Sequence, residues 1–158
     1  MKIAIIGSRE YQSKNKIKDF IWQAKNKYGK ELQIISGGAK YGADKYAKNF
    51  SLEMGVDYGE YPPVHENHNM YCVQPSFVFN KPYNVGNYHL RNMKIVDNSD
   101  VVVAFCKGKL TNGTRSAINY CIKKEKKFII IVGGKKSLDI YGKTIYCSLY
   151  EYIRSILK

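Results

Sequence analysis

The sequence predicts an α/β protein with three layers and a mostly parallel sheet of about five strands. Two observations carry this prediction: short apolar runs alternate with amphipathic segments, and glycine or proline closes most of them. The 158 residues are 44% hydrophobic and 25% charged, which fits a folded domain and not a disordered chain. With no internal repeat, we expect one domain spanning 1–158.

In the first part of the chain, three short apolar runs end at glycine or proline. They predict strands at Lys2–Ile6, Leu32–Ser36 and Val56–Tyr61, the third being the weakest. Between these runs, apolar residues recur at helical spacing and a glycine follows the last of them. These segments predict helices at Lys14–Tyr28 and Gly42–Met54.

After residue 84 the same alternation resumes. The run VVVAF is the most strand-like in the chain and predicts a strand at Val101–Phe105, and FIIIV predicts another at Phe128–Val132. Helical spacing predicts helices at Val85–Asn98 and Gly113–Lys124.

Two segments fall outside this alternation. Residues 64–84 predict a long irregular loop or lid, because connections of about 20 residues are usually functional or disordered. Its aromatic side chains either stack on a base, or pack on each other or on a neighbouring subunit: Tyr71, Phe77, Phe79 and Tyr83. Residues 135–158 form a C-terminal extension, with an edge strand expected at 144–147 and a helix at Ser148–Leu157.

Charge and cysteine content narrow the classes of function. The net charge is 26 − 13 = +13, which attracts polyanions, but only four of the 26 basic residues are Arg. Base-reading sites favour Arg, so a nucleic acid is a less favoured partner than a small polyanion. No apolar run approaches the roughly 20 residues that span a bilayer. The four cysteines form no C-x-x-C pair and no secretory leader is apparent, so we expect free thiols in a cytoplasmic protein.

Three glycine-bearing turns follow predicted strands, and a parallel sheet would bring them to one edge. Glycine lets a ligand approach the backbone, and the helix N-termini beyond the turns suit phosphate. Hydroxyl groups and one arginine add donors. The pattern predicts an anion or nucleotide site made by Gly7, Ser8 and Arg9 in the first turn, Ser36, Gly37, Gly38, Ala39 and Gly42 in the second, and Asn112, Gly113 and Thr114 in the third.

None of these turns is a standard nucleotide fingerprint. The segment Gly37–Gly42 does not match G-x-G-x-x-G, and no acidic residue follows the next strand to bind a ribose as in NAD enzymes. The chain has no G-x-x-x-x-G-K-[ST] either, which excludes a P-loop NTPase.

Taken together, four segments resemble the SLOG superfamily. They are GSRE at Gly7–Glu10, SGGAKYGAD at Ser36–Asp44, RNMKIVDNSDVVVAF at Arg91–Phe105 and NGT at Asn112–Thr114. Their order and spacing over 1–132 are most similar to a YspA-like branch, and more distantly to Lonely Guy-type phosphoribohydrolases and the DNA-processing protein A domain. The resemblance implies a Rossmann-like fold, a nucleotide-derived ligand and a homo-oligomer. We expect no resident cofactor.

The phosphoribohydrolases carry an Arg nine residues before an Asp that begins a strand. Arg91 and Asp100 have this spacing, so the resemblance implies a phosphate-facing role for Arg91 and adds Asn92, which replaces the family's Lys, to the ligand-binding set. We expect Asp100 to cap the strand edge. No Glu follows Thr114, which argues against glycosidic hydrolysis by that family's mechanism. Asp44 is the remaining weak candidate for a catalytic acid or a ribose partner, or else it complements a helix dipole.

Three hypotheses of function remain. The first is a sensor or sequestering protein for a nucleoside phosphate or an ADP-ribose-like signal. The second is an N-glycosidic hydrolase acting on nucleoside monophosphates, with Asp44 or Glu10 as its carboxylate. The third is a single-stranded DNA-binding module.

A metal site is not expected. His65, His68, Cys72 and His89 are present, but the first pair does not form H-E-x-x-H.

Overall fold

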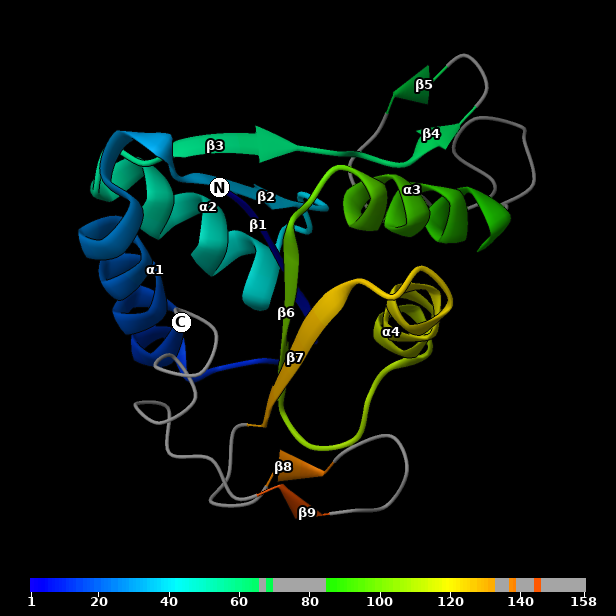
Figure 1. Cartoon of the computed structure of the whole chain (residues 1–158). Helices are drawn as coiled ribbons and strands as arrows, with labels where there is room; N and C mark the ends of the chain where they lie inside the picture. The colour runs from blue at the N-terminus through cyan, green and yellow to red at the C-terminus, as the bar shows by residue number, and fades with distance from the viewer. Residues whose placement is uncertain (66–67, 70–84, 133–136, 139–143, 146–158) are drawn as a thin grey trace.

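A central parallel sheet organises the computed structural model, which describes residues 1–65, 68–69, 85–132, 137–138 and 144–145 (Figure 1). Its five strands lie in the order β3-β2-β1-β6-β7. Their bounds are Lys2–Gly7 (β1), Gln33–Ser36 (β2), Asp57–Glu60 (β3), Val101–Cys106 (β6) and Lys127–Val132 (β7). The predicted parallel sheet of about five strands is confirmed, with each boundary within one residue of the prediction.

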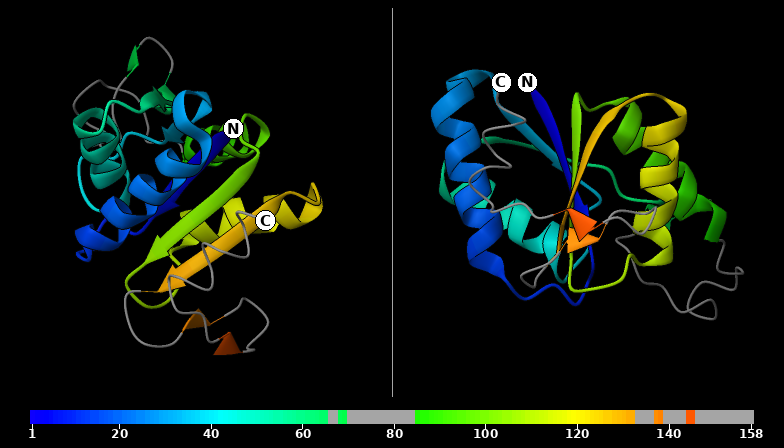
Figure 2. Two further views of the ribbon diagram at one scale, coloured as in Figure 1. Left: turned by 60° about the vertical axis from the view of Figure 1, so that its left-hand side comes forward. Right: turned by 60° about the horizontal axis from the view of Figure 1, so that its bottom comes forward.

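Two pairs of helices cover the two faces of this sheet. One face is covered by α1 (Lys14–Tyr28) and α2 (Ala43–Glu53), and the other by α3 (Val85–Asp97) and α4 (Asn112–Lys123). The right-hand view of Figure 2 shows the sheet between the two pairs. A short 3-10 helix, η1 (Gly29–Glu31), joins α1 to β2. The predicted helix 113–124 in fact begins at Asn112, because Thr111 caps it.

The core follows the alternation of side chains along the central strands. In β1, Ile3 and Ile5 pack towards α1 and α2, whereas Ala4 and Ile6 pack towards α3 and α4. Strand β6 is buried along its whole length, as expected for a parallel strand covered on both faces. Asp100 accepts a hydrogen bond from the Lys2 N–H at 2.7 Å, which confirms its expected place at the strand edge.

The topology creates a crevice between β1 and β6. The chain adds β2 and β3 on one side of β1 and then crosses to place β6 on the other side. Gly7 at the end of β1 lies opposite Phe105 near the end of β6. The chain leaves these strands towards helices on opposite faces. Open α/β sheets bind ligands at such a switch point.

Two small antiparallel sheets correct the expectations for the long loop and the C-terminal extension. Within the loop expected to be irregular, β4 (Val64–His65) pairs with β5 (His68–Asn69). The edge strand expected at 144–147 is wrong: β9 (Thr144–Ile145) pairs with β8 (Ser137–Leu138) and not with the main sheet. A nearby partner needs only a short loop to be closed, which favours the local pair.

Other predictions for these segments fall outside the described residues. These are the helix at 148–157 and the packing of the aromatic side chains at 71, 77, 79 and 83.

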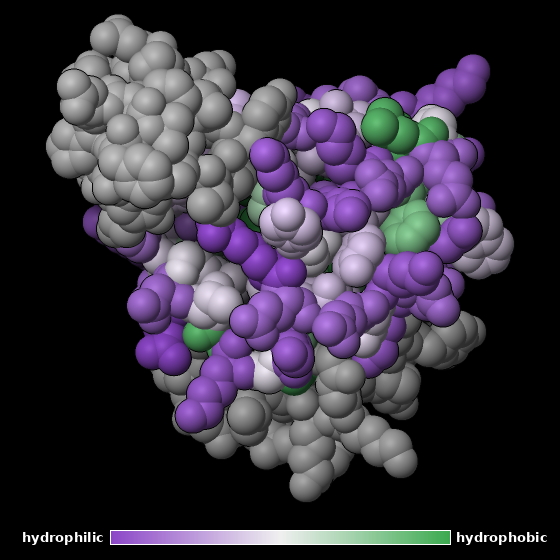
Figure 3. All heavy atoms as spheres, turned by 180° about the vertical axis from the view of Figure 1, so that it is seen from behind, coloured by the Kyte–Doolittle hydropathy of each residue, from purple (hydrophilic) through white to green (hydrophobic). Residues whose placement is uncertain are grey.

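The surface is mostly hydrophilic with scattered apolar spots. Figure 3 shows this from behind the view of Figure 1. Leu52 and Leu90, exposed at 61% and 58%, lie on different helices. Within the described ranges, no helix combines the length and apolar character needed to cross a bilayer.

Candidate functional site

A cleft of about 770 Å³ opens at the carboxyl edge of the sheet, at the switch point between β1 and β6. Three loops and two helices supply most of its walls. The loops are those that follow β1, β2 and β6, and the helices are α3 and the N-terminal part of α4. The lining residues that we use below are Ser8, Arg9, Glu10, Gly37, Ala39, Asp44, Tyr88, His89, Arg91, Asn92, Lys107, Lys109, Thr111, Asn112, Gly113 and Thr114.

Ser8 shapes the loop that follows β1. Its N–H donates to the Phe105 carbonyl at 2.9 Å, and its hydroxyl accepts from the Glu10 N–H at 3.1 Å. The side chain is buried, so the hydroxyl organises the turn. Gly42 lies directly against this turn, because a Cβ there would stand 2.1 Å from the Ser8 carbonyl oxygen and its φ is +69°. The loops after β1 and β2 are thus packed together, with Arg9 exposed beside the cleft.

Gly37 is held between an arginine and a carboxylate. The Arg91 guanidinium donates from Nη1 to the Gly37 carbonyl at 2.5 Å and to the Tyr61 carbonyl at 3.4 Å. A Cβ on Gly37 would stand 1.9 Å from that nitrogen and 2.9 Å from Asp44 Oδ2. Only glycine fits between them. The Asp44 Oδ2 atom accepts from the Ala39 N–H at 3.2 Å, which fixes the next part of the loop.

Asp44 is a buried carboxyl group in the first turn of α2. Burial raises its pKa from 3.8 to about 6. Arg91 opposes this rise, as do hydrogen bonds from the backbone of Ala39 and Gly37 and the charge of Arg9. A carboxyl group with this pKa changes its protonation state close to neutral pH, which suits acid–base chemistry as well as hydrogen bonding to a hydroxyl.

The N-terminus of α4 points its backbone groups at the cleft. Thr111 is the N-cap, and its hydroxyl accepts from the Thr114 N–H at 3.4 Å. The first turn contains no acidic residue, and Thr111, Asn112 and Gly113 are exposed. The first N–H groups of a helix have no acceptor within the helix, so this end offers donors and a partial positive charge.

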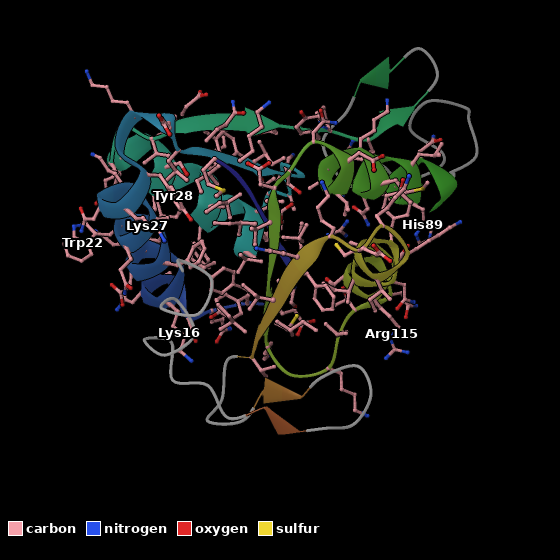
Figure 4. The ribbon with its side chains drawn as sticks, viewed as in Figure 1. Lys16, Trp22, Lys27, Tyr28, His89 and Arg115 are labelled. Carbon is pink, nitrogen blue, oxygen red and sulfur yellow. The ribbon has the colours of Figure 1, made fainter. Side chains whose placement is uncertain are left out.

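Helix α3 forms the remaining wall and is tied to α4 by side chains. His89 Nδ1 and Ser116 Oγ are 2.8 Å apart, and Asn92 Nδ2 donates to the Gly113 carbonyl at 3.1 Å. Figure 4 shows His89 on the side of the molecule occupied by α3 and α4. The Arg91 guanidinium lies 5.9 Å from the centre of the Tyr88 ring.

Positive charge exceeds negative charge around the cleft. Four cationic side chains line it, Arg9, Arg91, Lys107 and Lys109, against the carboxyl groups of Glu10 and Asp44. Lys107 and Glu10 form an exposed ion pair at 3.4 Å, which water screens strongly. The cleft therefore favours anions.

Eleven of the fourteen residues predicted to bind a ligand line this cleft, and Ser36, Gly38 and Gly42 do not. Ser36 is buried at the end of β2, where its hydroxyl lies 2.6 Å from the Tyr58 hydroxyl. Gly38 faces the side chain of Glu60. These three residues support the loop behind the cleft.

Sequence reasoning missed several lining residues. Lys107, Gly108 and Lys109 precede the third turn, and Thr111 could have been found as the N-cap in the string TNGT. Tyr88 and His89 could not be predicted as lining residues. The helical pattern of α3 indicates which of its residues face the core, but not which loops its other faces approach.

The structure adds two facts on metal and thiol chemistry. Among the residues it describes, no three His, Cys, Asp or Glu side chains are grouped to hold a metal ion. His65, His68 and Cys72 have no described side chains. Cys106 and Cys121 are free and buried, as expected for thiols, and burial raises the pKa of each to about 11.

Solved structures share this fold at low sequence identity. The molybdenum cofactor binding protein of Rippkaea orientalis has a TM-score of 0.63 and 19% identity, over 99% of this chain and 97% of that one. DNA processing protein A from Helicobacter pylori, described for its single-stranded DNA binding, has a TM-score of 0.65 and 19% identity, over 99% of this chain and 80% of that one. A molybdenum cofactor carrier protein from Chlamydomonas reinhardtii has a TM-score of 0.58 and 16% identity, over 98% of this chain and 95% of that one.

Sequence comparison is more specific than these structural likenesses. No curated protein matches the chain. A family model does match, over residues 34–155, which is most of the chain and includes the loops after β2 and β6. The predicted SLOG resemblance is confirmed: the chain belongs to the circularly permutated YpsA SLOG family.

Proposed function

We propose that the cleft binds a phosphorylated small molecule derived from a nucleotide, and that the protein acts as its sensor or sequestering protein. Nucleoside phosphates and ADP-ribose-like molecules are the ligand class. The observation that carries this proposal is the exposed N-terminus of α4, which faces the same cleft as Arg9, Lys107 and Lys109. Backbone N–H donors, a helix dipole and nearby cations are together the usual environment of a bound phosphate group.

The solved neighbours support this class of role without identifying the ligand. One is a molybdenum cofactor binding protein and another is a carrier of that cofactor, so this fold holds small cofactors in other proteins. The likeness to DNA processing protein A supports the alternative of single-stranded DNA binding. All of these identities are below 20%, so the support for a phosphorylated ligand comes from the cleft itself.

Isothermal titration calorimetry with ribose 5-phosphate, AMP and ADP-ribose tests the proposal. We expect saturable binding of at least one of these ligands. Arg9→Gln and Lys107→Gln should each weaken it, about tenfold for the arginine, because a charge-assisted hydrogen bond to phosphate is lost. Lys27→Gln is the matched control, since this exposed residue lies in the last turn of α1, at the opposite edge of the sheet (Figure 4).

The Lys27 control also distinguishes a defined phosphate site from non-specific attraction of anions to a positively charged protein. A variant at Lys27 that loses as much affinity as the variant at Lys107 would contradict a defined site and favour non-specific binding of anions. Binding of a single-stranded oligonucleotide with a steep dependence on salt, together with no binding of the three small ligands, would favour the DNA-binding alternative.

One observation favours a second function, hydrolysis of an N-glycosidic bond. Asp44 lines the cleft with a pKa of about 6, which allows a carboxyl group to exchange protons near neutral pH. The protein incubated with nucleoside monophosphates would then release free base, measured by liquid chromatography, and Asp44→Asn would stop the release. If the protein binds these ligands but releases no free base, the result supports the sensor or sequestering function instead of hydrolysis.

A further inference from the structure

Tyr41 is an unusually exposed aromatic residue in the loop between β2 and α2, directly before the N-cap residue Gly42. It is 63% exposed, the largest value among the exposed large hydrophobic side chains of the described residues. Its hydroxyl has no hydrogen-bond partner in the part of the chain that the structure describes. A tyrosine ring offers a large apolar face, which is most often at least partly covered in a folded protein.

Tyr41 is not among the lining residues, but its backbone lies between two residues that are close to the cleft. On one side, Ala39 lines the cleft and its N–H is bound by Asp44. On the other side, Gly42 packs on the backbone of Ser8 and Arg9, where a Cβ would stand 2.6 Å from the Arg9 Cα. Neighbouring Cα atoms are about 3.8 Å apart, so the backbone of Tyr41 is one step from a residue that touches the anion-binding loop.

Tyr88, an aromatic residue that does line the cleft, is less available for stacking. Tyr88 lines the cleft, but its hydroxyl oxygen is buried and the Arg91 guanidinium lies over its ring. A planar group of a ligand would have to displace that arginine, which also holds the Gly37 carbonyl. The ring of Tyr41 has no such partner.

We propose that Tyr41 is a stacking platform for a planar ring of the ligand, and that the site therefore selects phosphorylated molecules that carry a nucleobase or a similar heteroaromatic ring. This inference rests on the proposed function, because the phosphate group places the ring. Nucleobases stack on exposed aromatic side chains with little dependence on which base is present, since every base has a π-face. Arg9 and the N-terminus of α4 would hold the phosphate, and Tyr41 would distinguish a nucleotide from a sugar phosphate.

A paired titration with AMP and ribose 5-phosphate tests this role. Tyr41→Ala should weaken AMP binding about tenfold, the effect of losing one stacked base, and leave ribose 5-phosphate unchanged. Tyr41→Phe should retain AMP affinity, because the ring and not the hydroxyl is used. Trp22→Ala is the matched control, since Trp22 is 56% exposed on α1 and points away from the molecule on the far side from His89 (Figure 4).

Fluorescence gives an independent readout. Trp22 is the only tryptophan, so Tyr41→Trp combined with Trp22→Phe places a single reporter in the loop between β2 and α2. AMP should quench this reporter and ribose 5-phosphate should not.

The outcomes separate the two proposals. If the wild type binds none of ribose 5-phosphate, AMP and ADP-ribose, the proposed function and the stacking role both fail. If it binds AMP and ribose 5-phosphate but Tyr41→Ala weakens both equally or neither, only the stacking role is overturned. A reporter at position 41 that AMP does not quench overturns it as well.

Discussion

Protonation of the buried Asp44 should make the stability of the protein depend on pH in a direction opposite to that of most carboxylates. Its pKa is raised from 3.8 to about 6, so the native state binds a proton that the unfolded state has already released between these values. The stabilising contribution of protonated Asp44 is complete below about pH 4 and is lost as pH rises through 6. At about 1.36 kcal/mol for each pKa unit, the loss is about 3 kcal/mol.

Asp44→Asn isolates this contribution, because the amide oxygen can still accept the hydrogen bond from Ala39 but cannot ionise. We expect the free energy of unfolding of the wild type, minus that of the variant, to fall by about 3 kcal/mol between pH 3 and 7. Urea unfolding, followed by circular dichroism in phosphate-free buffers, measures both proteins. Asp19→Asn, on the exposed surface of α1, controls for the loss of one negative charge.

A difference between wild type and Asp44→Asn that stays flat, or rises with pH, would refute this reasoning. It would mean that Arg91 and the two loop N–H groups stabilise the carboxylate more than burial destabilises it. Asp44 would then be a permanent anion inside a cleft that we expect to hold a phosphate.

Three further predictions concern packing and reactivity. Gly42→Ala should cost clearly more stability than Gly55→Ala in urea unfolding, because both have φ near +65° but only the Cβ at position 42 meets backbone atoms. Phe105→Ala should cost about 3–5 kcal/mol by the same assay, because the ring is fully buried; a cost below 1 kcal/mol would contradict the described core. Peptide mapping should find Cys106 and Cys121 unmodified after a brief exposure of the native protein to iodoacetamide at pH 8, and modified after unfolding, because burial raises both thiol pKa values to about 11.

Most of the fold could be predicted because its strands are buried on both faces. Such strands need continuous apolar runs, and the runs at Lys2–Gly7 and Val101–Cys106 leave no other interpretation in an alternating chain. The prediction at 144–147 failed because a short apolar run does not specify its partner. Strand pairing depends on which neighbour is closest along the chain and in space, and β8 was nearer than the open edge of the sheet.

The location of the candidate site could be predicted from the sequence, but the roles of several of its individual residues could not. Glycine turns after parallel strands must meet at one edge, so the sequence located the cleft. It did not reveal that Ser36 and Gly42 support the loops from behind. Nor did it identify Lys107 and Lys109, because lysines are so numerous in this chain that two more between a strand and a helix carry little signal.

The contacts of Arg91 bear on which residues could hold the phosphate group that we propose as part of the ligand. The resemblance to phosphoribohydrolases implies that this arginine faces the phosphate, yet one of its nitrogens already donates to the Gly37 and Tyr61 carbonyls. Removing Arg91 would therefore disturb the loop as well as the charge, and its loss could not be interpreted as loss of a ligand contact. Arg9 lies on the exposed side of the same cleft, and its removal leaves these carbonyl contacts intact. Substitution of Arg9 therefore tests ligand binding, whereas substitution of Arg91 tests the architecture of the loop.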